Sequence, residues 1–105
     1  MDMSESYDRN SFEDRFLREN QICSSACRHL ADWALAHFGD RTEGEAYKRI
    51  VHSLAVSGAD YAIDKVYKDL NSLGYTYRSE AVMRMYERFR RDAEIRYDVD
   101  HDIAA

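Results

Sequence analysis

The chain has 105 residues, of which 45% are hydrophobic and 33% are charged, and its formal net charge is −5. This length suits one compact domain with a small core, and the acidic balance argues against broad electrostatic binding of DNA, RNA or anionic lipid. No apolar run approaches the ~20 residues that a membrane helix needs. Because the N-terminus is polar and acidic, it is not a secretory signal, and we expect a cytoplasmic protein with no membrane-inserted segment.

The composition favours helices throughout, since proline is absent and only four residues are glycine. Residues 1–11 lack periodicity and are expected to be disordered. Ser11, followed by acidic residues, has the pattern of an N-cap and a first helical turn. From Phe12 to Ala34, apolar residues recur at helical spacing, which fits one long helix or two helices joined around residues 20–25. The first half is far more charged, so we expect it to project from the core as an exposed amphipathic arm.

The stretch of residues 27–39 is expected to organise the fold. It contains Trp33, the only tryptophan in the chain, and a tryptophan buries a large apolar area. Its alanines would let a neighbouring helix approach closely. Gly39 offers the positive φ that commonly ends a helix.

Two shorter helices are predicted next. Residues 42–45 read as a capping box with Thr42 as N-cap, and Gly58 would close the helix that follows. Asp60 is the predicted N-cap of the third helix, which would end at Gly74.

The fourth helix would begin with Thr76 or Ser79 as its cap and end near Arg96, leaving residues 97–105 as an acidic, disordered tail. Four amphipathic helices with short loops predict an all-α four-helix bundle, a single domain over residues 12–96. The apolar residues on the inner faces form the predicted core: Leu30, Trp33, Ala34, Phe38, Ile50, Val51, Leu54, Ile63, Val66, Leu70, Val82, Met85 and Phe89.

Few residues suggest chemistry. Cys23 and Cys27 are one helical turn apart and share a face, but a zinc site needs two further ligands. His29 lies on another face, and His52 is the only near candidate from another helix. The simplest interpretation is two small buried hydrophobic residues; a metal- or redox-responsive regulator is the alternative. With no catalytic motif or phosphate-binding loop, we expect no enzyme, no cofactor and no bound metal.

The last helix carries a basic run of Arg84, Arg88, Arg90 and Arg91. Acidic residues are interleaved with these arginines, which indicates a solvated helix face. The alternative is a docking strip for an acidic partner.

A series of short motifs resembles one family, the zeta subunit of F-type ATP synthases, the small ATPase inhibitor of alphaproteobacteria. Residues 33–39 resemble its L-x-W-A-(x)-x-L-G core, and residues 64–70 followed by Gly74 match its R-K-V-x-x-D-L-x-x-x-G pattern. The similarity also includes Ala46-Tyr47, Ile50-Val51, Gly58-Ala59-Asp60, Met85, Glu87 and Ala93. The ordered series runs from Phe12 to Ala93.

The resemblance implies a four-helix bundle that docks on the catalytic head of the ATP synthase. Its partners would be the alpha, beta and gamma subunits, which would place the chain in the cytoplasm or at the periphery of the inner membrane. In that family an N-terminal helical arm enters a catalytic interface and blocks ATP hydrolysis. This chain departs from the pattern, because its arm is shorter and residues 21–27 replace the family's Ala/Arg-rich segment.

Two hypotheses follow from the resemblance. In the first, the helix of residues 12–26 wedges between subunits and inhibits hydrolysis. Its predicted contact residues are four apolar anchors and two arginines: Phe12, Phe16, Leu17, Ile22, Arg15 and Arg18. In the second, the chain is a non-inhibitory paralogue that serves as a binding or assembly adaptor.

Overall fold

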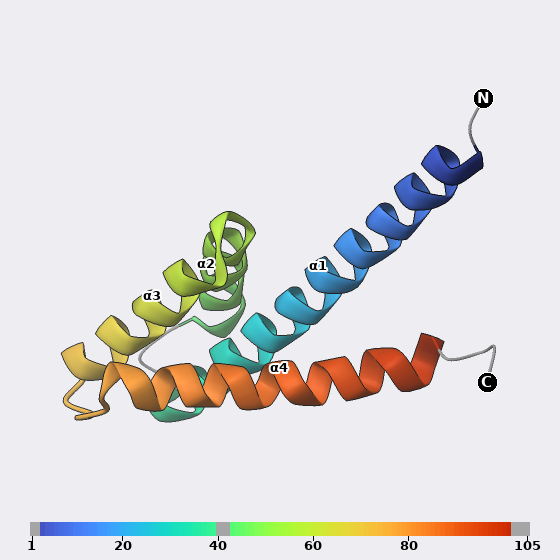
Figure 1. Cartoon of the computed structure of the whole chain (residues 1–105). Coiled ribbons are helices and arrows are strands. Elements are labelled where there is room, and N and C mark those ends of the chain that lie inside the picture. The colour runs from blue at the N-terminus through green and yellow to red at the C-terminus, as the bar shows by residue number, and fades with distance from the viewer. Residues whose placement is uncertain (1–2, 40–42, 102–105) are drawn as a thin grey trace.

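The computed structural model describes residues 3–39 and 43–101, with the backbone alone for residues 3–11. Its four α-helices are α1 (Met3–Phe38), α2 (Gly44–Ser57), α3 (Ala59–Ser72) and α4 (Ser79–His101) (Figure 1). The described residues contain no strand. The prediction of an all-α, four-helix fold is therefore confirmed. Of the two alternatives for the N-terminal part, one long helix and two helices joined around residues 20–25, the structure has one long helix.

Helix α1 is the common packing partner of the other three helices. It contacts α2, α3 and α4, whereas α2 and α4 make no contact with each other over the described ranges. Its N-terminal half continues away from the bundle as the predicted protruding arm (Figure 1), which makes the molecule 59 Å long and 27 by 25 Å across. We call residues 3–21 of α1 the arm, because burial begins at Ile22.

The core combines side chains from all four helices. Small residues, Ala26, Ala31 and Ala34, have no exposed surface and let neighbouring helices approach α1 closely. Eight predicted core residues are buried: Leu30, Ala34, Phe38, Val51, Ile63, Val66, Leu70 and Val82. Four more are half-buried against this core: Trp33, Leu54, Met85 and Phe89.

The prediction that Ile50 belongs to the core is wrong, because this side chain is 48% exposed. The next residue, Val51, is 1% exposed and occupies the inward position of α2. Consecutive helical residues point about 100° apart, so only one of the two could face α1 and α3.

Trp33 lies at the rim of the core, where it fastens the α3–α4 connector to the end of α1. Its ring meets the edge of Tyr77, with centroids 5.4 Å apart. The Tyr77 hydroxyl lies 2.9 Å from His37 Nε2, and the Tyr75 hydroxyl donates to the His37 backbone carbonyl at 2.8 Å. Trp33 is therefore half-buried, with one side against the core and another covered by the Tyr77 ring of the connector.

Helix α1 begins at Met3, so the predicted start at Ser11 is wrong. The backbone of residues 3–11 extends the arm away from the other helices (Figure 1), and an isolated helical end without packing partners is marginal in water. The expected disorder of residues 1–11 in solution stays a prediction.

Glycines end the helices largely where the sequence predicts. Gly39 has φ 60° and follows the last residue of α1. Gly58 ends α2, and its N–H donates to the carbonyls of Leu54 and Ala55.

The N-caps of α2 and α3 differ from those predicted. Gly58 is also the N-cap of α3, so the predicted cap at Asp60 is wrong, and Asp60 lies in the first turn. The N-cap of α2 is Glu43, while the predicted cap Thr42 falls between the two described ranges.

Helix α4 continues to His101, beyond the predicted end near Arg96. Residues 97–101 are therefore helical rather than part of a disordered tail, and the remainder of that predicted tail, residues 102–105, is not among those described. The physical reason is tertiary: Arg18 of the arm binds Asp98 and lies over the Tyr97 ring at 5.9 Å.

We predict that Leu30→Ala lowers the free energy of unfolding far more than Ile50→Ala does. Leu30 has no exposed surface, so its truncation should lower the free energy of unfolding by about 2–5 kcal/mol. Because Ile50 is exposed, its truncation should lower the free energy of unfolding by less than about 1 kcal/mol. Urea denaturation followed by circular dichroism measures both values, and equal losses would contradict the assignment of Ile50 to the surface.

Candidate protein-binding site

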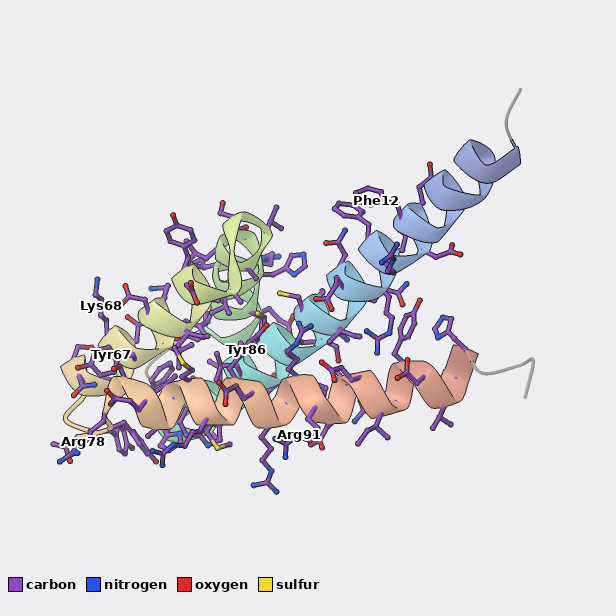
Figure 2. All side chains as sticks on the ribbon, viewed as in Figure 1. Phe12, Tyr67, Lys68, Arg78, Tyr86 and Arg91 are labelled. Atoms are coloured by element: carbon purple, nitrogen blue, oxygen red, sulfur yellow. The ribbon has the colours of Figure 1, made fainter. Side chains whose placement is uncertain are left out.

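The arm carries an exposed apolar face. Phe12 and Phe16 lie one turn apart, and their rings stack with centroids separated by 6.4 Å. Their exposed fractions are 66% and 58%, and that of the neighbouring Leu17 is 56%. Figure 2 shows Phe12 projecting from α1 beyond the reach of the other helices. Large exposed apolar groups gathered in one place mark a surface suited to a protein partner.

This face leads into a groove of about 800 Å³ between α1, the C-terminal end of α2 and the C-terminal half of α4. Phe16, Leu17 and Val56 contribute apolar surface to its lining, and Val56 is 79% exposed. Arg28 and Arg96 contribute positive charge. Asp100 also lines the groove, which therefore combines apolar surface with charged side chains of both signs.

Ile22 is not part of the exposed face of the arm, although it is among the residues that line the groove. We predicted it as an apolar anchor of the arm, but it is 1% exposed and belongs to the buried interior. Ala26, one turn later, has no exposed surface. The segment available to a partner is thus shorter than the predicted wedge of residues 12–26, because α2 and α4 already contact its last turns through the Ser24–His52 and Cys23–Tyr86 pairs.

The two predicted arginines have different surroundings. Arg15 is exposed on the arm. Arg18 donates from Nε and Nη2 to the two carboxylate oxygens of Asp98, at 3.2 and 3.1 Å, and the hydrogen bond to Asp98 raises the pKa of its guanidinium. Arg18 therefore fastens the arm to α4, and Arg15 is the one of the two that a partner could reach without breaking this pair.

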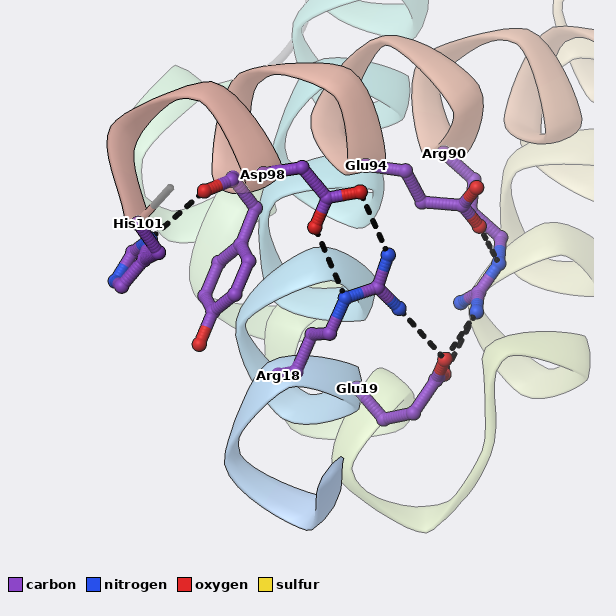
Figure 3. A network of polar contacts seen from close by, with 7 residues as sticks. Arg18, Glu19, Arg90, Glu94, Asp98 and His101 are labelled. Carbon is purple, nitrogen blue, oxygen red and sulfur yellow. Dashed lines mark hydrogen bonds and ion pairs between the residues drawn. The ribbon is translucent and has the colours of Figure 1, made fainter. Parts of the chain in front are cut away.

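A second ion pair joins the same helices about two turns earlier along α4 (Figure 3). Arg90 donates through Nη2 to both carboxylate oxygens of Glu19 at 2.7 Å, and its Nε lies 3.1 Å from the Glu94 carboxylate. The hydrogen bond with Glu19 raises the pKa of Arg90. Since charge-assisted pairs have defined geometry, the two arginines, one from each helix, fix the direction in which the arm leaves the bundle.

Sequence reasoning missed this network. Arg18 and Asp98 are 80 positions apart, and Glu19 and Arg90 are 71 apart. A helical pattern reveals pairs three or four residues apart, and only the Arg90–Glu94 contact is of this kind. The contribution of Val56 to the groove was also missed, because its exposure depends on how α2 ends against α1.

Cys23 contacts α4 and also lines the groove, whereas Cys27 belongs to the buried core. Cys27 is 1% exposed, and Cys23 is half-buried. The Tyr86 hydroxyl donates to Cys23 Sγ at 3.7 Å. Burial raises the pKa of the Cys27 thiol to about 12, and the neighbouring Cys23 adds to this effect. Both side chains therefore pack as small hydrophobic residues, and the high pKa keeps Cys27 a neutral thiol near neutral pH.

The histidines of the predicted metal hypothesis are held elsewhere. His29 Nδ1 lies 2.8 Å from the Ser25 carbonyl, and its ring stacks near Phe89. His52 Nδ1 lies 3.5 Å from the Ser24 hydroxyl. Within the described ranges, no group of three or more His, Cys, Asp or Glu side chains could hold a metal ion.

No family model, curated protein or solved structure matches this chain. Among the described helices, none combines the length and apolarity needed to span a membrane.

We predict that Asp98→Asn loosens the end of α4. The amide removes the charge that holds Arg18, so backbone amides of residues 97–101 should exchange hydrogen about threefold faster or more. Hydrogen exchange followed by mass spectrometry measures this, with Glu80→Gln as a control that removes an exposed carboxylate at the other end of α4. Unchanged exchange in Asp98→Asn would mean that the pair does not hold the end of the helix.

We also predict alkaline destabilisation through Cys27. The folded state raises the pKa of this thiol from its ordinary value of 9.0 to about 12, so the folded chain retains a proton that the unfolded chain releases. The contribution of this thiol to the free energy of unfolding should be fully present below pH 9 and should be lost as the pH rises toward 12. Urea denaturation at neutral and alkaline pH should show a smaller loss in Cys27→Ala than in the wild type. Equal losses in the two chains would contradict this assignment.

Proposed function

We propose that this chain is a regulatory protein that binds the catalytic head of an F-type ATP synthase through its arm and inhibits ATP hydrolysis. The observation that carries the proposal is the exposed apolar face of Phe12, Phe16 and Leu17 on a helix whose base is fixed by ion pairs. The choice of the catalytic head as the partner rests on the resemblance of the helix motifs to the zeta subunit family.

The mechanism is steric. The turns of the arm that carry Phe12, Phe16 and Leu17 are helical and are oriented by the ion pairs at their base. These turns therefore lose little conformational freedom when they bind, which favours affinity. Burying a phenylalanine or leucine side chain contributes about 1.5–3 kcal/mol. Three such side chains on α1 contribute several kcal/mol toward placing the arm in an interface between catalytic subunits, and a wedge in that interface would stop the rotary cycle.

The second candidate function is a binding or assembly adaptor without inhibition. The burial of Ile22 and Ala26 favours this alternative, because it shortens the segment that can enter a deep interface. Both candidates use the same arm, and they differ in whether the bound arm reaches the catalytic site.

Hydrolysis of ATP by the cognate catalytic head separates these functions from each other. Wild-type protein in micromolar excess should inhibit hydrolysis, and Phe12→Ser/Phe16→Ser should weaken inhibition at least tenfold, because losing about 1.4 kcal/mol of binding energy already gives that factor. Tyr61→Ser/Met83→Ser is the matched control, since it removes two exposed apolar side chains far from the arm.

Three outcomes decide between the candidates. Equal effects of the two double variants would show that the arm is not the binding element. Capture of the synthase subunits by the wild type without any loss of hydrolysis would favour the adaptor. Absence of both capture and inhibition would refute the proposal.

A further inference from the structure

Helix α4 has an outer face that no other helix covers. Five residues recur along it at positions i, i+4, i+7, i+11 and i+15, a spacing that places them on one side of a helix. We call these residues the outer stripe: Arg84, Arg88, Arg91, Ile95 and Val99. All five are exposed, and Figure 2 shows Arg91 pointing away from the bundle. The buried residues of the same helix, Val82, Tyr86 and Ala93, lie on its opposite side.

The three arginines of the outer stripe make no ion pair or hydrogen bond with any described residue. This is notable because each has an acidic residue four positions away, the spacing that usually forms helix ion pairs. The unformed pairs are Glu80–Arg84, Glu87–Arg91 and Arg88–Asp92. In contrast, Arg90 on the inner side of α4 binds Glu94 and Glu19. The basic run of α4 therefore divides into one arginine used inside the fold and three whose guanidinium groups face solvent.

Apolar residues extend the stripe toward the C-terminal end of α4. Ile95 is 59% exposed and Val99 is 72% exposed. With a rise of about 1.5 Å per residue, the stripe from Arg84 to Val99 is about 22 Å long. The surface thus offers three cations followed by two β-branched side chains along one line.

We propose that the outer stripe binds an acidic amphipathic helix of a partner protein. Carboxylates of such a helix would take bidentate contacts from the arginines, and its apolar residues would cover Ile95 and Val99. A nucleic acid or an anionic membrane presents continuous negative charge, which would also meet the unpaired carboxylates of Glu80 and Glu87 beside the stripe and the net charge of −5. A helix presents separate carboxylates, so it can contact the arginines and avoid these acidic neighbours.

The outer stripe is independent of the arm. It lies on the side of α4 opposite Tyr86, whereas the arm is joined to the inner side through Glu19 and Arg90. Binding at the stripe would leave Phe12 and Phe16 accessible.

The test uses the full chain and a fluorescent peptide of about 20 residues, designed as a helix with leucines along one face and glutamates beside them. Fluorescence anisotropy should show binding that weakens as salt is added. Arg84→Gln/Arg88→Gln/Arg91→Gln should weaken it at least tenfold, and Ile95→Ser/Val99→Ser should weaken it about threefold or more. The matched control, Arg49→Gln/Lys68→Gln/Arg78→Gln, removes three exposed cations elsewhere and should bind within about twofold of the wild type. Circular dichroism melting verifies that each variant is folded.

Four results would overturn the proposal. One is absence of peptide binding by the wild type, and another is an equal loss in the two triple variants, which would reflect net charge alone. The third is equal affinity for a peptide with glutamine in place of each glutamate. The fourth is tighter binding of phosphatidylglycerol vesicles or duplex DNA than of the acidic peptide, which would assign the arginines to phosphate recognition.

Discussion

The packing of three helices on the inner face of α1 is the constraint on which the rest of the structure depends. Leu30, Ala31 and Ala34 are fully buried there, and α2 and α4 contact α1 without contacting each other. Interiors are close-packed, so a break in α1 between Ile22 and Phe38 would disturb the packing of all three helices that contact it. The helix must therefore be continuous through the core, and the arm is its uninterrupted extension.

The direction of the arm follows from this arrangement. Because α1 is continuous, the arm takes its axis from the core, and the Arg18–Asp98 and Glu19–Arg90 pairs hold it against α4 at the point where it leaves the bundle. An arm that is oriented before binding can present Phe12 and Phe16 to a partner at a low entropic cost. The apolar face of the arm and its polar base thus have complementary roles, one in contact and the other in positioning.

Helix α4 uses neighbouring charges for different purposes. Arg90 and Arg91 are adjacent in the sequence but point about 100° apart on a helix. Arg90 therefore reaches Glu19 across the α1–α4 contact, whereas Arg91 faces solvent together with Arg84 and Arg88. The inner side of α4 therefore uses its charges to bind α1, and the outer side presents its charges to solvent. The two sides do not compete for the same side chains.

Local patterns in the sequence were enough to predict the helices, most of the core and two helix ends. Apolar periodicity predicted four helices and most of the core, from Leu30 to Val82, because these features repeat within a few residues; glycine marked the ends at Gly39 and Gly58 for the same reason. Which of two adjacent apolar residues faces inward, as with Ile50 and Val51, was decided only by the neighbouring helices. The same holds for the burial of Ile22, which removed it from the predicted binding surface, and for the extension of α4 to His101 through Arg18 and Asp98. Each of these depends on residues brought together from distant parts of the chain, and such contacts leave no periodic signal in the sequence.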